Sequence, residues 1–477
     1  MRKNENSLRK AQKNTDLALA HFDGLYARVY GRMWPSMRLG LLSPKKQCAV
    51  LNSFIDNDEL HRAMIEEQGA VYLQKYYNKH LRHYTRWQIR QRISENKKLR
   101  KRELIAREQD VAPESISLDG IEVSDVSDSE VKSVQTTDAS DGFSPAEDLV
   151  EMFSDRRMDD DEKYFVNQAS TQLMLNEFVQ PTEFFSKEHI TSDISYYDHY
   201  EADLNSSIEF REEAPLEICD QLRVYCFPRG DWSRFDKPEV HEQAKLLNFY
   251  HLDGASILPV LALDLQMDDI CADYCAAPGG KTLAMLMTLR PKQLICNDSS
   301  ISRLNRLRRV VQGYLPDISY VRSTLQLANH DARTLVQPDS FNKILVDVPC
   351  SNDRNSVESI DNNLFKRTRT EERLQLPETQ CKILVSAMKS LQPKGDLVYS
   401  TCTLSPVEND GVVQKAFTQL QVENHPAKFA VVNLKEAFRP FRGLFKFNTR
   451  FKYGQQVLPD VCSNFGPMYI CKIKRLN

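Results

Sequence analysis

Apolar side chains recur every three or four residues in the first part of the chain. This spacing predicts helices over residues 16–72, with a break at Trp34-Pro35 and a second helix start at Ser43-Pro44. The apolar positions that set the pattern are Leu17, Leu19, Phe22, Leu25, Tyr26, Leu51, Phe54 and Ile55. We therefore expect a helical N-terminal extension, which we place at residues 1–107.

After residue 220 the pattern changes to short apolar runs separated by segments of helix length. A strand is predicted at 222–227 and a helix at 256–263, and from there strands and helices alternate as they do around parallel sheets. The strands that follow are predicted at 270–272, 294–298, 320–321, 343–348, 397–400, 429–432 and 468–471, with helices opening near 283, 302 and 370 and after Pro406. We predict an α/β fold over residues 221–477, a doubly wound, Rossmann-like sheet of about seven mostly parallel strands.

Charge is segregated along the chain, so the formal net charge of −3 hides two opposite segments. Residues 75–107 are strongly basic, with aromatic residues between the cations. Cations for phosphates beside rings for stacking are typical of an RNA-binding segment. A solvated helix with a few inward-facing rings has the same composition, so both interpretations stay open.

The next segment, residues 108–162, is acidic and rich in serine. It holds too few large apolar residues to offset the entropy lost on ordering, so we predict a disordered insertion that serves as a linker or an acidic arm. Residues 163–220 give no clear pattern, and we assign them to a poorly defined connecting region.

The eleven cysteines are scattered and form no Cys-x-x-Cys pair, so we expect no metal site. An odd number of cysteines, several of them in predicted strands, is typical of a reducing compartment. No run reaches the eighteen or so apolar residues of a membrane span, and we expect no membrane partner. The basic residues at the start lack a clear apolar face and make a poor targeting helix on their own.

One stretch joins a predicted strand to a predicted helix through two glycines: Asp273-Tyr274-Cys275-Ala276-Ala277-Pro278-Gly279-Gly280-Lys281-Thr282. Such junctions hold nucleotide-like ligands, and glycine lets the backbone approach the ligand closely. A phosphate-binding P-loop needs glycine where this chain has Cys275, and Pro278 lacks the amide that would contact a phosphate. The stretch therefore predicts a cofactor pocket that is not a P-loop.

Three acidic residues follow successive predicted strands. Asp298 lies about twenty residues beyond the glycines, where a carboxylate accepts hydrogen bonds from both ribose hydroxyls. Asp331 comes after the next strand, in position to hold an adenine amino group, and Asp347 ends the strand beside the expected reaction centre. One such aspartate is more often a cap or turn residue, but three in sheet order predict an adenosyl cofactor.

Two cysteines stand just past the predicted ends of central strands, at the edge of the sheet that faces ligands: Cys350 in Asp347-Val348-Pro349-Cys350 and Cys402 in Tyr399-Ser400-Thr401-Cys402. Either alone is readily explained as a small buried hydrophobe, and a disulfide between them is disfavoured in a reducing compartment. If the two strands are adjacent, both sulfurs face one pocket. A thiolate that attacks C6 of a pyrimidine makes C5 nucleophilic enough to accept a methyl group from a sulfonium donor.

The order and spacing of three segments, at 273–282, 347–351 and 399–404, resemble the signatures of the Nol/Nop/Sun family of RNA cytosine-5 methyltransferases over roughly residues 220–475. Further segments resemble the branch that acts on mitochondrial small-subunit rRNA: 34–38, 345–350, 363–367 and 464–469. The resemblance implies a methyltransferase domain, S-adenosyl-L-methionine as cofactor, and RNA, above all rRNA, as substrate.

The resemblance also implies roles for single residues. Cys402 would be the nucleophile, Cys350 would help to release the product, and Asp347 would belong to the catalytic set. Since DNA cytosine methyltransferases use the Pro-Cys thiol as nucleophile, attack by Cys350 is the alternative. The positions that match the family's cofactor site are Gly279, Gly280, Lys281, Asp298, Arg303, Asp331, Ala332 and Asp347, where Ala332 replaces a glycine of the related branch.

The same branch implies a mitochondrial location, a role in ribosome assembly and a helical-repeat partner of the mitochondrial termination-factor family. Two other readings stay open. One is a cytosolic or nucleolar tRNA or rRNA cytosine-5 methyltransferase, and the other is a ribosome-assembly scaffold that keeps the pocket without turnover. The intact Cys350 and Cys402 argue against a scaffold role alone.

Overall fold

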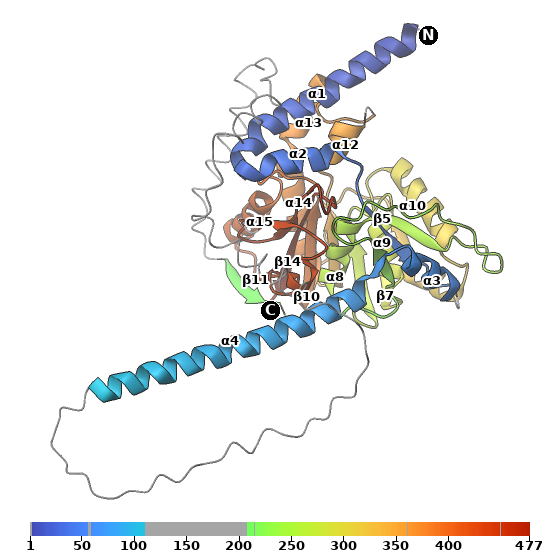
Figure 1. The fold of residues 1–477 in the computed structure, drawn as a ribbon. Coiled ribbons are helices and arrows are strands. Elements are labelled where there is room, and N and C mark those ends of the chain that lie inside the picture. Colours follow the sequence, from blue (N-terminus) through green and yellow to red (C-terminus); the bar gives the residue numbers. More distant parts are fainter. Residues whose placement is uncertain (1, 56–58, 110–207, 214, 360, 449) are drawn as a thin grey trace, which may run out of the picture. The chain divides into compact units, whose positions relative to one another are not determined.

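The computed structural model describes residues 2–55, 59–109, 208–213, 215–359, 361–448 and 450–477 (Figure 1). The acidic insertion expected at 108–162 and most of the connecting region expected at 163–220 lie outside these residues. Residues up to Gln91 belong to the same compact unit as the described residues from 208 onward. Residues 92–109, the last part of helix α4 (Leu73–Gln109), belong to another unit. The first unit contains the two sheets described below.

The larger sheet has ten strands in the described residues, in the order β12-β13-β14-β10-β9-β6-β7-β8, with β11 paired to β14 and β3 paired to β11. Its strands are β3 (Glu209–Glu212), β6 (Asp269–Asp273), β7 (Pro291–Asn297), β8 (Leu325–Ala328), β9 (Phe341–Asp347), β10 (Leu391–Thr401), β11 (Phe429–Asn433), β12 (Phe447–Asn448), β13 (Gln455–Val457) and β14 (Met468–Arg475). Strands β8, β7, β6, β9 and β10 run parallel, and β14 is antiparallel to β10. The predicted α/β, mostly parallel sheet is confirmed.

The predicted count of about seven strands was too low, because β3, β12 and β13 are only two to four residues long and too short to show a period. The strand predicted at 320–321 was wrong. Tyr320 and Val321 lie in helix α11 (Ser319–Thr324), and the strand follows directly as β8. Aromatic and β-branched residues favour a strand, but here Val321 is buried as part of a short helix instead.

Alternate residues of the parallel strands face two separate apolar cores, as the pleat requires. Cys271, Leu345 and Val398 join one core with helices α8 (Leu258–Leu263), α9 (Gly280–Leu286) and α10 (Ile301–Tyr314). Their neighbours Ala272, Ile344 and Leu397 join the other with helices α14 (Leu376–Ser390) and α15 (Asp410–Val422). Helices therefore cover both faces, as Figure 1 shows.

The N-terminal segment is only partly helical. It forms helices α1 (Arg2–Tyr30), α2 (Trp34–Leu42), α3 (Glu59–Glu67) and α4 (Leu73–Gln109), but also strands β1 (Gln47–Leu51) and β2 (Val71–Tyr72). These strands join β4 (Val224–Cys226) and β5 (Phe249–Asp253) in an antiparallel sheet, β2-β4-β1-β5. The helical prediction for 16–72 was therefore wrong over β1 and β2.

Two prolines mark one correct and one wrong boundary in this segment. The predicted break at Trp34-Pro35 is present, because α1 ends at Tyr30 and Trp34 starts α2, whose first turn accepts the proline. Ser43 precedes a proline and is extended, with φ −93° and ψ 152°, so the chain leaves α2 and enters β1 instead of starting a helix.

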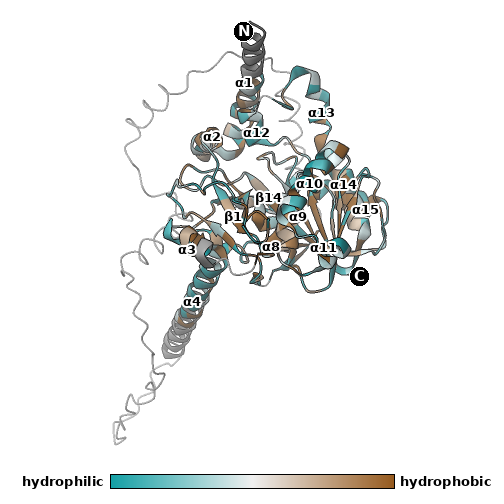
Figure 2. Ribbon diagram, turned by 90° about the vertical axis from the view of Figure 1, so that its right-hand side faces the viewer, coloured by the Kyte–Doolittle hydropathy of each residue, from teal (hydrophilic) through white to brown (hydrophobic). Residues whose placement is uncertain are grey.

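The remaining elements are short and lie between the helices and strands already named: η1 (Gly31–Met33), η3 (Gly254–Ile257), α12 (Asp353–Glu358), η4 (Arg367–Arg369), α13 (Thr370–Leu374) and η5 (Arg439–Phe441). Figure 2 shows brown, apolar residues in the strands of the sheet, whereas the coloured part of α4 is largely teal. None of the described helices combines the length and apolar character that crossing a membrane requires.

Candidate active site

The parallel register aligns the C-terminal ends of five strands at one edge of the sheet. Asp273 pairs with Cys296 and Leu345, and Asp347 pairs with Ser400. We call the loops at 273–282, 297–303 and 328–333 the cofactor rim, and the loops at 347–356 and 400–410 the thiol rim. All predicted site residues lie on these two rims.

The glycine turn needs both of its glycines. Gly279 caps α9 with φ +112°, a left-handed conformation that residues with a Cβ rarely adopt. At Gly280 a Cβ would lie 2.8 Å from Leu252 Cδ1 and 3.2 Å from Tyr250 Cε1, so β5 packs directly on the backbone. The packing of β5 therefore requires glycine at position 280 even before a ligand is considered.

Asn297 joins the three loops of the cofactor rim. Its Nδ2 donates to the carbonyls of Tyr274 and His330, each at 3.1 Å, and its Oδ1 accepts from His330 N at 2.8 Å. Sequence analysis missed this residue, although it immediately precedes Asp298 at the end of a predicted strand.

Asp298 is 2% exposed, and its carboxylate holds the glycine turn. It accepts from Ala277 N at 3.3 Å and Ser300 N at 2.9 Å, and Arg303 Nη1 lies 3.4 Å from Oδ2. Arg303 also donates to the Ala277 carbonyl. The predicted pair Asp298 and Arg303 therefore forms one connected structure with the turn.

Asp331 is more exposed than Asp298. Its carboxylate pairs with Arg333 Nη2 at 2.6 Å, and this hydrogen-bonded arginine lowers the pKa of Asp331. Ala332 between them is buried against the core of α14 and α15.

Lys281 and Asp347 form an ion pair, with Nζ 2.8 Å from Oδ2, that connects the glycine turn to the end of β9. Ser400 Oγ donates to the other oxygen of Asp347 at 2.7 Å. Burial alone would lower the pKa of Lys281, but the attraction of Asp347 outweighs it and the pKa is raised. Lys281 therefore stays charged between the two rims.

Asp273 is a buried acid that sequence analysis quoted but gave no role. Its Oδ2 accepts from Thr282 Oγ1 at 2.7 Å, whereas Oδ1 has no hydrogen-bond partner within the described part of the chain. Burial raises the pKa of Asp273 to about 7. The unpaired Oδ1 lies at the edge of the sheet that faces ligands, so it is suited to accept a hydrogen bond from a positively charged group of a ligand.

The two predicted thiols meet. Cys350 Sγ and Cys402 Sγ are 3.2 Å apart, and Cys402 N donates to Cys350 Sγ at 3.3 Å. Cys350 is only 8% exposed, whereas Cys402 is partly open. The hydrogen bond with Cys402, followed by burial, raises the pKa of Cys350 well above its ordinary value. The two sulfurs are thus unequal in exposure, and the raised pKa favours the protonated form of Cys350.

Asp353 joins the two loops that carry the thiols. Fully buried, it accepts from Ser351 Oγ at 3.0 Å, Thr403 Oγ1 at 2.9 Å and Leu404 N at 2.6 Å. The fourth donor is Tyr26 OH of α1 at 2.9 Å.

Glu408 holds the same loops from a second side. It accepts from Ser351 N and from Gln380 Nε2, both at 2.9 Å. Gln380 Nε2 also donates to the Pro349 carbonyl at 2.9 Å. Burial raises the pKa of Glu408 to about 7.

The N-terminal helices brace this rim. Besides Tyr26, Tyr30 OH donates to the Leu404 carbonyl at 2.6 Å. Arg354, one residue after Asp353, is buried and donates to the carbonyls of Gly40 and Ser43 at 2.9 and 2.8 Å. Sequence analysis counted Tyr26 only as an apolar position of a helix, because nothing in its local pattern signals a partner more than 300 residues away.

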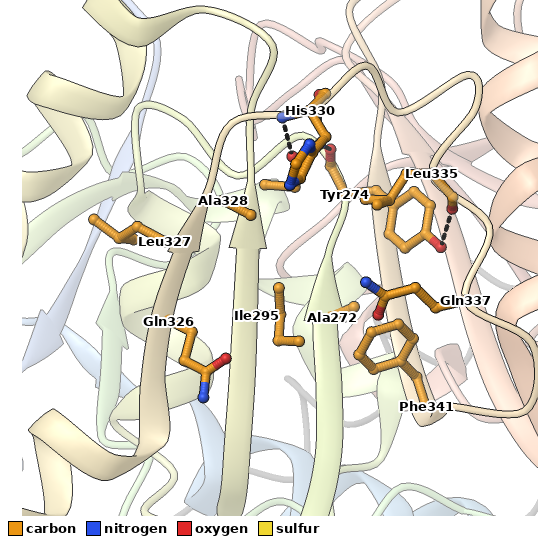
Figure 3. A pocket seen from close by; sticks show the side chains of 11 residues that line it. Ala272, Tyr274, Ile295, Gln326, Leu327, Ala328, His330, Leu335, Gln337 and Phe341 are labelled. Carbon is orange, nitrogen blue, oxygen red and sulfur yellow. Dashed lines mark hydrogen bonds between the residues drawn. The ribbon is translucent and has the colours of Figure 1, made fainter.

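A pocket of about 180 Å³ lies behind the cofactor rim on one sheet face (Figure 3). Figure 3 shows Ala272, Ile295 and Gln326 on adjacent strands below it, and His330 and Tyr274 at its upper border. None of the predicted site residues lines it. The predicted site residues and this pocket are therefore separate features of the sheet.

The chain matches known proteins along most of its length. Residues 260–473 match the family described as 16S rRNA methyltransferase RsmB/F. The 5-cytosine rRNA methyltransferase nsun-4 of Caenorhabditis elegans is 33% identical over 479 residues, which cover 96% of this chain and 91% of that protein. The 5-cytosine rRNA methyltransferase NSUN4 of Mus musculus is 40% identical over 263 residues, or 55% of this chain and 68% of that protein. A tRNA (cytosine(34)-C(5))-methyltransferase, mitochondrial, of Mus musculus is 37% identical over 240 residues, or 50% and 66%.

Proposed function

Because the chain belongs to the RsmB/F and NSUN4 family of S-adenosyl-L-methionine-dependent rRNA cytosine-5 methyltransferases, we propose that its target is a cytosine of mitochondrial small-subunit rRNA. We further propose that methylation proceeds through a covalent adduct of Cys402 with C6. The observation that carries the mechanism is the 3.2 Å approach of the two thiols beside the Lys281–Asp347 ion pair.

The cofactor rim fits S-adenosyl-L-methionine. Gly279, Gly280 and Lys281 would lie along the cofactor, Asp298 and Arg303 beside its ribose, and Asp331 and Ala332 beside its adenine. The unpartnered Oδ1 of Asp273 is an acceptor of the kind that an α-ammonium group requires. When bound, the cofactor supplies an electrophilic methyl group on a sulfonium.

The inequality of the sulfurs supports Cys402 as the nucleophile. It is the more exposed thiol, and protonated Cys350 can donate to a Cys402 thiolate. Attack on C6 forms the S–C6 bond and moves an electron pair toward C5, which accepts the methyl group. Removal of the C5 proton by a base restores the C5–C6 double bond and expels the Cys402 thiolate.

Cys350 acts at this last stage in the proposed mechanism, because its Sγ lies 3.2 Å from the departing sulfur. Asp347 keeps Lys281 at the site, and a fixed cation favours a thiolate. Attack by Cys350 itself is disfavoured by its burial and its raised pKa.

Trapping experiments separate these roles. With a cytosine-containing rRNA fragment and cofactor, Cys402→Ala should neither methylate nor form an adduct, whereas Cys350→Ala should accumulate protein–RNA adduct on a denaturing gel. The reverse pattern would make Cys350 the nucleophile.

The mitochondrial location is supported by the similarity to the mitochondrial tRNA (cytosine(34)-C(5))-methyltransferase of Mus musculus. Bisulfite sequencing of organellar and cytosolic RNAs after depletion tests it, and loss of methylation only from a cytosolic RNA would contradict it. Affinity capture of the full chain from mitochondria tests the expected termination-factor partner. If Cys402→Ala restored ribosome assembly in depleted cells, the assembly role would not need turnover.

A further inference from the structure

Helix α4 presents a continuous row of cations on one face. Lys75, Lys79, Arg82, Arg86 and Arg90 are all exposed and recur every three or four residues, which places them on one side of the helix. The row is about 22 Å long at 1.5 Å per residue. Between Leu73 and Ser94 the sequence has no Asp or Glu, so no acid on this stretch of the helix offsets the row.

The opposite face fixes how the helix is turned. Leu73 and Tyr77 are buried in the core that contains α8 and α9. Tyr77 OH donates to the Ala437 carbonyl at 3.0 Å and accepts from Leu216 N at 2.8 Å. Because Leu73 and Tyr77 lie about half a turn away from the cations, packing directs the row toward solvent.

A second row, of rings, lies beside the first. Tyr76, His80, His83 and Trp87 repeat at the same spacing, about a quarter turn from the cations. The rings of Tyr76 and His80 are 4.1 Å apart between centroids. Trp87 is 40% exposed and stacks on Tyr84 at 5.9 Å, with the guanidinium of Arg439 4.3 Å from the Tyr84 ring. The stack holds the Trp87 ring in place while leaving part of it open.

We propose that the face of α4 from Lys75 to Arg90 is a binding surface for single-stranded RNA. Phosphates contact the row of cations and bases stack on the row of rings, since single-strand binding combines a basic track with aromatic platforms. The inference extends the proposed function by naming a surface outside the reaction centre that holds the RNA substrate.

The rings favour RNA over an acidic protein segment. A segment such as residues 108–162 of this chain, which ends in Asp159-Asp160-Asp161-Glu162, would satisfy the cations. It would leave the open part of the Trp87 ring without a stacking role, because carboxylates do not stack. Single-stranded RNA uses both rows.

The decisive experiment compares two triple variants of the full chain with equal charge loss. The first is Arg82→Gln, Arg86→Gln and Arg90→Gln. The control is Lys292→Gln, Lys394→Gln and Lys428→Gln, three exposed lysines near the starts of β7 and β11 and within β10. Binding of a labelled single-stranded, cytosine-containing RNA is measured over a range of salt concentrations.

The α4 variant should bind RNA at least about ten-fold more weakly, with a salt slope smaller by about 2, because each phosphate contact on a single strand contributes about 0.7. The control should change affinity less than about two-fold. Equal losses of affinity in both variants would overturn the proposal, and so would unchanged RNA binding by the α4 variant. Tighter RNA binding by the α4 variant would also overturn it and would assign the row of cations to an acidic protein segment.

A further variant tests the ring row. Trp87→Ala should weaken single-stranded RNA binding at least about five-fold and leave duplex binding unchanged, because only unpaired bases stack on a side chain. Equal weakening for both RNAs would contradict the stacking role.

Turnover separates this proposal from the proposed function. At saturating RNA the α4 variant should methylate at the wild-type rate with a raised KM for RNA. Failure of the wild-type protein to methylate rRNA would overturn the function. If the wild-type protein methylates rRNA and the α4 variant binds RNA as tightly as the wild type, only the proposal of an RNA-binding surface on α4 would be overturned.

Discussion

The cofactor rim and the thiol rim share one sheet edge but are held by different kinds of contact. In the cofactor rim, Asn297 and Asp298 hold loops that lie at most 33 positions away in the chain. In the thiol rim, Tyr26 reaches Asp353 across 327 positions and Tyr30 reaches Leu404 across 374. The cofactor rim is thus held by contacts that are close in the chain, whereas the thiol rim also takes contacts from the first forty or so residues.

The largest effect is expected from removing the carboxylate that joins the thiol loops. Asp353→Ala leaves the hydroxyls of Tyr26 and Thr403 and the amide of Leu404 without their acceptor. Each stranded buried donor costs about 1–3 kcal/mol, so the free energy of unfolding should fall by at least about 3 kcal/mol. Urea unfolding followed by circular dichroism measures this, and a loss below about 1 kcal/mol would show that the rim is not held by Asp353.

A smaller change separates the two rims in function. Tyr26→Phe keeps the ring against Phe22 and removes only the hydroxyl. We expect single-turnover methylation to slow by about ten-fold, which corresponds to about 1.4 kcal/mol, while cofactor affinity stays within about two-fold. Tyr320→Phe, which loses a 3.2 Å hydrogen bond to the Pro291 carbonyl far from the thiols, is the matched control. A parallel loss of cofactor affinity in Tyr26→Phe would show that the rims are not independent.

The buried acid Glu408 gives the thiol rim a pH dependence. Its pKa is raised from 4.5 to about 7 in the folded protein. As pH rises from about 4.5 through 7, the unfolded chain loses this proton first, so the free energy of unfolding falls by at most about 3 kcal/mol. Glu408→Gln should lose less stability between pH 5 and pH 7.5 than the wild type does. Urea unfolding at both pH values measures the difference, and identical losses would contradict the buried-acid account.

The smallest effect is expected at the exposed pair of the cofactor rim. Arg333→Ala removes the partner of Asp331, but both side chains are open to solvent. Exposed pairs contribute about 0–1 kcal/mol, so the unfolding free energy should change by less than about 0.5 kcal/mol. Calorimetric titration with the cofactor should give an affinity within about two-fold of the wild type, and a larger loss would mean that Arg333 contacts the ligand.

The same contrast explains what the sequence could predict. The glycine turn, Asp298 and Arg303 are close in sequence, and the structure joins them directly. The positions of Cys350 and Cys402 followed from strand periodicity, because residues just after parallel strands meet at one edge. Local patterns therefore located both thiols.

What the sequence did not show depends on distant partners. Strand β1 pairs with β4 and β5 about 180–200 residues later, so its five residues carry no helix-or-strand signal strong enough to override the helical spacing around them. Tyr26 and Asp353 each look like ordinary helix residues until the fold brings them together.

The brace from the N-terminal helices makes the thiol rim sensitive to loss of the first part of the chain. Helix α1 contributes Ala18, Phe22, Tyr26 and Tyr30 to one buried cluster that also contains Phe365 and Leu404, and Leu404 belongs to the thiol rim. Loss of the chain through Tyr30 would remove both tyrosine hydroxyls that reach the thiol rim. The contacts of Asn297 and Asp298 in the cofactor rim involve none of these residues.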